Sequence, residues 1–257
     1  MPETIDRQLI RSILSKDPVW SVYALGDLSP RRLAHATWYV TSTQDALILL
    51  YREFGRPVLF ALGEAESLLS EIAPEPEMYL QIKPGLVSAI ERLGYRLNWT
   101  KHMIRMSLHC YAAVDTAGAE PLSNAAELRA LYSDGEQKNE SPDFFFDSML
   151  DDGTFFGIRR EGQLIAAAGT HLTAAEEGVA AIGNVYVHRD WRGRGFGRTV
   201  TAAVTEELLK RGIRTIALNV SHTNESAIRT YERLGFIPHC EFREGFCEGS
   251  PEYPMVP

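Results

Sequence analysis

The chain has 257 residues, of which 45% are hydrophobic and 23% charged, the composition of an ordinary globular protein. Its 26 Lys and Arg residues against 34 Asp and Glu residues give a formal net charge of −8. Because a general nucleic-acid binder needs basic groups to neutralise phosphates, this balance argues against that class of protein. No zinc spacing or disulfide framework is found among Cys110, Cys240 and Cys247. The chain has neither an 18-residue apolar run nor a basic-then-apolar leader, so we expect a cytoplasmic protein without membrane contact.

The charge is divided unevenly along the chain. Residues 1–115 hold 12 basic and 13 acidic residues, whereas residues 116–257 hold 14 basic and 21 acidic residues. The acidic half nevertheless contains the densest cluster of arginine and glycine. An acidic surround is compatible with a cationic partner, and the basic cluster marks a local site of opposite sign.

The N-terminal half is predicted to mix helices and strands. Helical spacing of apolar residues, or flanking Pro and Gly residues, predicts helices at 5–15, 18–28, 64–72 and 84–93. Short apolar runs predict strands at 36–41, 46–51, 58–62, 78–82 and 97–108. Residues 113–121 are small, polar and end in Pro, so they are predicted to link a domain at 1–112 to a domain at 122–257.

The C-terminal half is predicted to follow the order α-α-β-β-β-α-β-α-β. Its helices are expected after Ser123 or Asn124, either of which suits an N-cap, and at 143–150, 197–211 and 224–234. Its strands are expected at 155–160, 164–173, 179–188, 215–220 and 236–242, with turns that favour an antiparallel meander for the first three. The N-terminal half has a similar order, and the phrase E-R-L-G-aromatic ends a helix at both Glu91–Tyr95 and Glu232–Phe236. Together these features favour a duplication.

One segment carries the strongest chemical signal, because a strand there leads through a glycine-rich turn into a helix. Three glycines alternate with larger residues, and three arginines add positive charge: Arg192, Gly193, Arg194, Gly195, Phe196, Gly197 and Arg198. Free amides at a helix start bind anions, so the segment predicts a pyrophosphate site. It is neither a nucleotide P-loop nor a dinucleotide fingerprint, since Val200 occupies the third glycine position of the latter. The alternative is a tight strand–helix turn with solvated arginines.

These residues resemble a known family. Arg192–Gly197 resembles the acyl-CoA-binding signature of the GNAT superfamily of N-acyltransferases, and Asn219–Phe236 resembles its second signature. The resemblance covers about residues 120–245. It implies a mixed α/β (α+β) fold with a central, mainly antiparallel sheet flanked by helices, and two tandem GNAT-like domains. The N-terminal one would be a degenerate repeat, because it has no equivalent of the glycine-rich turn.

The resemblance also implies roles for individual residues. The amides of Arg192 to Arg198 would hold the pyrophosphate of coenzyme A, and the strand Val185, Tyr186 and Val187 would pair through its backbone with the pantetheine arm. That strand and the one near 217–220 would splay apart to make room. Asn224 would hydrogen-bond the pantetheine arm, and Tyr231 would act as general acid toward the leaving thiolate. The alternative for Tyr231 is a core aromatic residue.

The sequence leaves the identity of the general base open. Glu176 and Glu177 precede the central strand and His171 ends the strand before it. A run of acidic residues at helical spacing either attracts a cationic substrate or forms an exposed helix face: Asp143, Asp147, Asp151 and Asp152. No metal site is expected.

The resemblance implies an N-acetyltransferase (EC 2.3.1.-) with acetyl-CoA as co-substrate. It would move the acetyl group to a primary amine of a small molecule or peptide by direct attack in a ternary complex. The alternatives are a longer-chain or amino-acid N-acyltransferase similar to glycine N-acyltransferases, and a non-catalytic acyl-CoA sensor. The acceptor is not identified, and a homodimer is one option for the oligomeric state.

Overall fold

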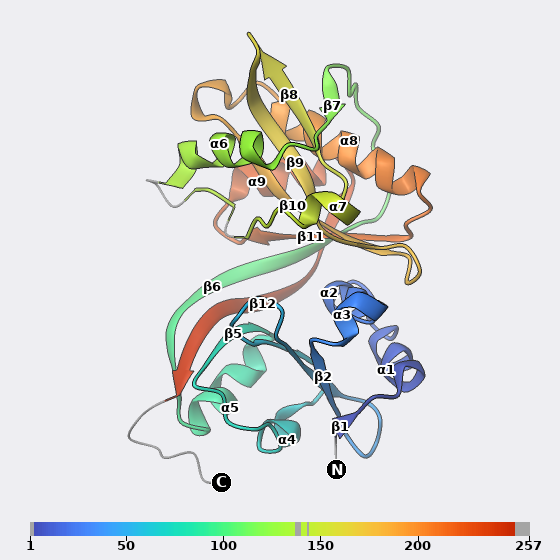
Figure 1. Cartoon of the computed structure of the whole chain (residues 1–257), viewed down its shortest axis with the longest axis vertical. Helices are drawn as coiled ribbons and strands as arrows, with labels where there is room; N and C mark the ends of the chain where they lie inside the picture. Colours follow the sequence, from blue (N-terminus) through green and yellow to red (C-terminus); the bar gives the residue numbers. More distant parts are fainter. Residues whose placement is uncertain (1–2, 137–139, 143, 250–257) are drawn as a thin grey trace. The chain divides into compact units, whose positions relative to one another are not determined.

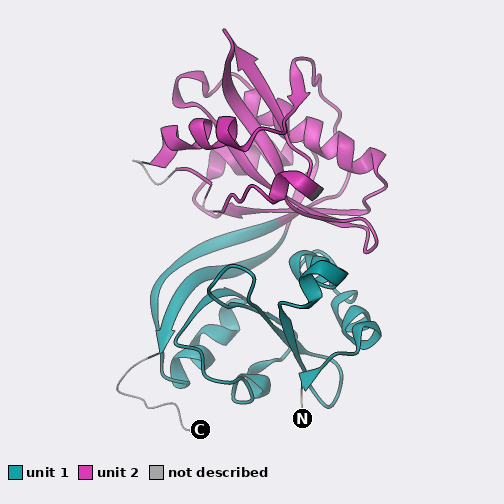
Figure 2. Cartoon of the chain, viewed as in Figure 1, with its two compact units in different colours: residues 1–105, 239–257 teal, residues 106–238 magenta. Residues whose placement is uncertain are grey.

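The computed structural model describes residues 3–136, 140–142 and 144–249, and these fall into two compact units. Unit 1 contains the chain up to Arg105 together with the C-terminal residues from His239, and unit 2 is Met106–Pro238 (Figure 2). Two long strands, β6 (Tyr95–Leu108) and β12 (Phe236–Gly249), contribute residues to both units. The segment 113–121 is not all linker, because Ala119–Pro121 forms strand β7 and pairs with the next strand.

Unit 1 is built on a mixed sheet with the strand order β1-β2-β3-β4-β5-β12-β6. Its remaining strands are β1 Glu3–Thr4, β2 Ala36–Val40, β3 Leu47–Tyr51, β4 Val58–Leu62 and β5 Glu77–Ile82. Its helical segments are α1 Arg7–Leu14, α2 Val22–Gly26, α3 Pro30–Leu33, α4 Glu66–Leu69, η1 Pro84–Leu86 and α5 Val87–Arg92. Strands β4 and β5 are parallel, whereas β2, β3 and β4 are antiparallel neighbours.

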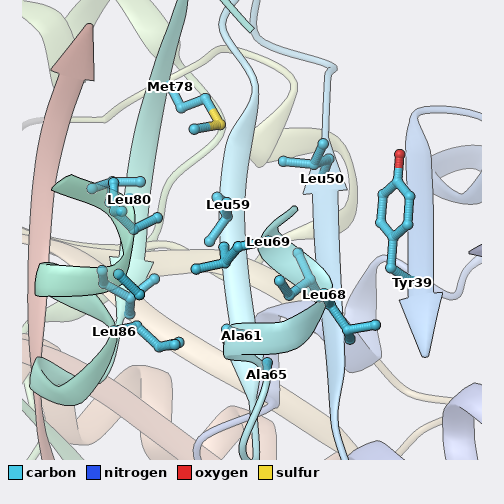
Figure 3. Close-up of a cluster of buried hydrophobic side chains, with 14 of the residues drawn as sticks. Tyr39, Leu50, Leu59, Ala61, Ala65, Leu68, Leu69, Met78, Leu80 and Leu86 are labelled. Carbon is cyan, nitrogen blue, oxygen red and sulfur yellow. The ribbon is translucent and has the colours of Figure 1, made fainter. Parts of the chain in front are cut away.

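One core cluster of unit 1 lies between its sheet and the helices α4 and α5, and α1 and α2 also bury apolar side chains. All five residues of β3 are buried, which explains their continuous apolar run. Leu68 and Leu69 of α4 lie over Leu50 and Leu59 of the sheet (Figure 3). For β2 to β6, predicted and observed boundaries agree within one or two residues, whereas β12 extends seven residues beyond its predicted end at 242. The helices at 18–28 and 64–72 are shorter than predicted, as α2 and α4 show.

Unit 2 has the strand order β6-β11-β10-β9-β8-β7. Its other strands are β8 Phe156–Arg160, β9 Gln163–Ala174, β10 Val179–Val187 and β11 Thr215–Ser221. Its helical segments are α6 Ala125–Glu136, α7 Met149–Asp152, η2 Arg189–Trp191, α8 Phe196–Lys210 and α9 Glu225–Glu232. The predicted meander is confirmed, because β8, β9 and β10 are antiparallel neighbours and Glu161 and Gly162 both have positive φ at the first turn.

The helix predicted at 143–150 is wrong in its position. Asp143 lies outside the described residues, and the helix begins only at Met149. The side chain of Phe145 packs against Tyr132 and Phe155, with ring centroids 5.4 and 6.0 Å away. Phe145 thus lies in a non-helical segment before α7 and makes tertiary contacts that no local pattern encodes.

Helices α6 and α8 lie on opposite faces of the unit 2 sheet (Figure 1). Neighbouring residues of β10 point to opposite faces, as strand geometry requires. Tyr186 donates a hydrogen bond to Asp134 of α6, whereas Val187 faces Gly197 of α8. The sheet therefore separates an α6–α7 face from an α8 face.

Both units repeat one strand topology. In unit 1 three antiparallel strands, β2, β3 and β4, are followed by the parallel strand β5. In unit 2 the same arrangement is made by β8, β9 and β10, followed by β11. This repetition is the structural counterpart of the similar element order in the two halves. Within the described part of the chain, no helix is both long and apolar enough to cross a membrane.

Candidate functional site

The glycine-rich turn connects β10 to α8. Gly193 and Gly195 have φ values of 74° and 86°, a conformation that glycine adopts far more readily than other residues. A Cβ added to either glycine would meet nothing within 4 Å. The backbone of the turn is thus left-handed at both glycines, and the space next to these two positions is open. This is what a loop needs if its amides are to approach a ligand.

Helix α8 begins directly at this turn. The amides of Phe196, Gly197 and Arg198 lie in its first turn, where N–H groups have no acceptor within the helix. The helix dipole adds partial positive charge at the same place. Arg194 and Arg198 are exposed, and the Arg194 guanidinium stacks 4.9 Å from the ring centroid of Trp191. The start of α8 therefore has the geometry and the charge of an anion site.

Arg192 is exposed, but its guanidinium is held by other groups of the protein rather than free at the turn. Its guanidinium pairs with Glu140 at 2.8 Å and donates to the Tyr186 hydroxyl at 3.1 Å and to the Val187 carbonyl at 3.0 Å. Its amide donates to the carbonyl of Arg189. Arg192 thus ties the turn to β10, and a direct phosphate contact by this side chain would require these bonds to exchange.

Asp134 is a residue of this region that sequence reasoning missed. It lies on α6 and accepts hydrogen bonds from the Arg189 amide at 3.0 Å, the Arg189 Nε at 2.6 Å and the Tyr186 hydroxyl at 2.9 Å. Burial alone would raise the pKa of the Asp134 carboxyl, but these hydrogen bonds outweigh it and lower the pKa. Asp134 therefore stays ionised and fixes the segment that leads into the glycine-rich turn. Nothing in its local sequence distinguishes it from a solvated helix residue.

The pairing between β10 and β11 stops halfway along β10. The last paired residues are Ile182 and Leu218, and β10 then continues to Val187. Beyond that point the edge of β10 that faced β11, including Val185, has no ladder partner among the described residues on that side. The carbonyl of Val187 is already occupied by Arg192. The geometry leaves a backbone edge of the kind that an extended ligand can pair with.

A bulge interrupts β10 at the same level. Gly183 pairs with Gly169 and Tyr186 pairs with Ala167, so Asn184 and Val185 both lie opposite Ala168. Asn184 has a φ of 54° and is only 3% exposed. Its carbonyl accepts a hydrogen bond from the Tyr132 hydroxyl at 3.0 Å. The sequence pattern, which predicts a plain strand here, contains no signal for this bulge.

Asn224 and Tyr231 lie at the two ends of α9. Asn224 is the N-cap, and its side-chain oxygen accepts a hydrogen bond from the Ala227 amide at 3.1 Å. The Tyr231 ring is 7% exposed and packs edge-on against Phe236. Burial raises the pKa of the Tyr231 phenol to about 12, so the hydroxyl is neutral at physiological pH.

The base candidates are placed differently from one another. Glu176 and Glu177 lie in the turn before β10. Strand β10 separates them from the glycine-rich turn, and at roughly 3.3 Å per residue the path from Val179 to Val187 is about 26 Å long. The imidazole of His171 lies against Gly183, where any Cβ would clash with it. His171 is therefore close to the bulge, whereas the two glutamates are at the far end of the strand.

The acidic residues at 143–152 do not form one helix face. Asp147 pairs with Arg129, and Asp151 is exposed. Asp143 and the side chain of Asp152 lie outside what the structure describes. Among the residues with described positions, no cluster of three or more His, Cys, Asp or Glu side chains is arranged to hold a metal ion.

Comparison with known proteins agrees with this geometry. Residues 123–236 match the model of the Acetyltransferase (GNAT) family. The mycothiol acetyltransferase of Thermobispora bispora is 39% identical over 91 residues, which cover 34% of this chain and 31% of that protein. The [ribosomal protein bS18]-alanine N-acetyltransferase of Escherichia coli K12 is 36% identical over 81 residues, covering 32% of this chain and 53% of that protein. This chain thus spans about a third and about half of the lengths of these relatives.

The fold likeness extends further along the chain. A tandem GNAT protein from the clavulanic acid biosynthesis pathway superposes with a TM-score of 0.56 at 16% identity, covering 96% of this chain and 95% of that one. At this identity the likeness concerns the fold alone. The family match is confined to unit 2 and contains the glycine-rich turn, the bulge and α9. Residues 123–236 of this chain are therefore similar in sequence to the GNAT acetyltransferases and lie in a GNAT-like fold.

Proposed function

We propose that the protein transfers the acetyl group of acetyl-CoA to a primary amine of a small molecule or peptide, by direct attack in a ternary complex. The observation that carries the proposal is the start of α8, where an open glycine-rich turn and free amides lie next to the exposed Arg194 and Arg198. This arrangement suits the pyrophosphate of coenzyme A. The unpaired edge of β10 at Val185 continues from it and suits the extended pantetheine arm.

The relatives support an acetyl donor and an amine acceptor. One is named for acetylation of an alanine nitrogen of a ribosomal protein and the other is a mycothiol acetyltransferase. In the proposed step the amine nitrogen bonds to the acetyl carbon, the carbon–sulfur bond breaks, and the amine proton leaves to solvent or a base. The thiolate takes a proton from the neutral Tyr231 hydroxyl, which recovers one from solvent. Asn224 keeps its side-chain NH2 available to the pantetheine arm, because only its oxygen caps α9.

The binding site is tested with two matched variants at the two ends of α8. Gly195 and Gly212 have φ values of 86° and 76°, and neither has an atom within 4 Å of a built Cβ. Asp tolerates this conformation better than most residues, so both Gly195→Asp and Gly212→Asp should fold. A carboxylate at Gly195 would repel the pyrophosphate, and we expect its coenzyme A Kd to rise about tenfold or more. Gly212→Asp should bind like the wild type. Equal affinities measured by calorimetry would contradict the assignment.

The transfer reaction is tested with acetyl-CoA and three amines: a peptide that begins with alanine, ethanolamine and putrescine. Thiol release and the mass of the product report turnover. Transfer from acetyl-CoA to at least one amine, lost in Tyr231→Phe by tenfold or more in kcat, is the expected result. Preference for a longer acyl-CoA would favour the longer-chain alternative. Tight coenzyme A binding without transfer to any amine would favour the sensor.

A further inference from the structure

Asn184 presents a buried polar atom without a partner at the centre of unit 2. Its side-chain oxygen has no hydrogen-bond partner among the described residues, and the residue is 3% exposed. Leaving such an acceptor unsatisfied destabilises the folded state. Its backbone also adopts φ 54° within a strand, a left-handed conformation that is strained outside glycine, although Asn tolerates it better than most residues. Because the unpaired oxygen and the positive φ both lower the stability of the folded state, Asn184 is better explained by a role in function than by a role in stability.

The remaining polar atoms of Asn184 are fixed by the protein. The Tyr132 hydroxyl donates to its carbonyl at 3.0 Å, and its side-chain NH2 contacts the sulfur of Met149 at 3.5 Å. These contacts come from α6 and α7, so the side chain lies on the α6–α7 face. Met149 is partly exposed, and its flexible side chain lies over Asn184. Met149 thus engages the side-chain NH2 and leaves the amide oxygen without a described partner.

The position of Asn184 relates it to both proposed substrates. It directly precedes Val185, on the part of β10 that extends beyond the pairing with β11. The glycine-rich turn opens α8 on the other face of the sheet. A donor bound at α8 and along β10 therefore reaches the bulge from one face, while the side chain of Asn184 lies toward the other.

We propose that the side-chain oxygen of Asn184 accepts a hydrogen bond from the acceptor amine and aims its nitrogen at the acetyl carbon. This inference rests on the proposed function and names the residue that binds the amine. An amide oxygen accepts but does not take up a proton, so Asn184 orients the nucleophile and is not the base. The bound N–H also supplies the partner that the buried oxygen lacks.

The test compares three variants with the amine panel and acetyl-CoA. Asn184→Gly keeps the positive φ and removes the oxygen, and we expect the acceptor kcat/KM to fall about threefold to tenfold. Asn184→Asp keeps an acceptor oxygen of the same shape, and we expect it to retain acceptor binding. Thr154→Val is the matched control, because the Thr154 hydroxyl is also buried without a described partner but lies just before β8. It should leave the kinetics unchanged.

Coenzyme A affinity, measured on the same proteins, separates the outcomes. A selective loss of acceptor kcat/KM in Asn184→Gly, with coenzyme A Kd within twofold of the wild type, supports the inference. Unchanged acceptor kinetics in Asn184→Gly would overturn it and leave the proposed function standing. If Asn184→Gly fails to bind coenzyme A, Asn184→Asp decides: an acceptor KM within about threefold of the wild type supports the inference, whereas an acceptor KM raised tenfold or more with an unchanged coenzyme A Kd would overturn it. No transfer by the wild type to any of the three amines would overturn the proposed function, and this inference with it.

Discussion

The buried phenol of Tyr231 makes a quantitative prediction about stability at alkaline pH. Its pKa rises from 10.0 to about 12 on folding, because burial disfavours the charged phenolate. The folded state therefore binds its proton more tightly than the unfolded state. This contribution to stability is complete below pH 10 and is lost as the pH rises from 10 to 12. Replacing Tyr231 by Phe removes the titrating group and keeps the ring beside Phe236.

The magnitude follows from the two pKa values. Between pH 8 and pH 11, an unfolded phenol with a pKa of 10 becomes about ten parts ionised to one neutral, whereas one with a pKa of about 12 stays mostly neutral. Linkage then lowers the free energy of unfolding by about 1.4 kcal/mol over this interval, and by about 2.7 kcal/mol at still higher pH. Tyr231→Phe should lose about 1.4 kcal/mol less than the wild type between pH 8 and pH 11.

Urea denaturation followed by tryptophan fluorescence at pH 8 and pH 11 measures this difference. Other buried tyrosines titrate in both proteins, so their contribution cancels in the comparison. If the free energies of unfolding of the two proteins fall in parallel, burial does not raise the pKa of the Tyr231 phenol as described.

The same raised pKa keeps the phenol neutral from pH 7 to pH 9. We therefore expect the kcat ratio between wild type and Tyr231→Phe to be constant over this range.

Two further substitutions test how unit 2 is held together. Asp134→Asn removes the charge that receives the Arg189 and Tyr186 hydrogen bonds, so we expect stability to fall by about 1–3 kcal/mol and coenzyme A binding to weaken; a variant that keeps both values would show that Asp134 does not fix the turn. Gly235→Ala would drive a Cβ into the carbonyl of Cys110 at φ 94°, and we expect it to destabilise by at least about 2 kcal/mol. Gly212→Ala, also at positive φ but with open space around it, should cost about 1 kcal/mol. Equal unfolding midpoints for the two alanine variants would refute the clash.

Local patterns predicted the elements that carry their own signals. Helix α8 has apolar residues at helical spacing and ends near Gly212, and it begins within one residue of the predicted start. The strands β3 and β4 are bounded apolar runs, and both were placed to within a residue. Asn124 was one of two predicted caps, and its side chain indeed accepts from the Ala126 amide. In these cases the determinants lie within a few residues of the element.

Features set by distant contacts were not predictable in this way. The bulge at Asn184 depends on a register between β9 and β10, and the role of Asp134 depends on residues 52 and 55 positions away. The final strand was predicted to end at 242, but it continues to Gly249 because Arg243–Glu248 pair with β5. Gly195, Gly197 and Arg198 lie at the start of α8, whereas Arg192 bonds to β10 and Glu176 and Glu177 lie at the other end of that strand. The binding roles of these residues stay predictions.

The two strands that belong to both units constrain how this gene could have been assembled and how it could be taken apart. A reading frame divided at any single codon between 105 and 239 separates β12 from β5, its antiparallel partner in unit 1. A C-terminal fragment would then carry six residues, Arg243–Glu248, as a bare strand edge, which is a site for aggregation. The N-terminal fragment would lose the strand that lies between β5 and β6. Recombination that exchanges only unit 2 would therefore have to exchange a strand of unit 1 as well.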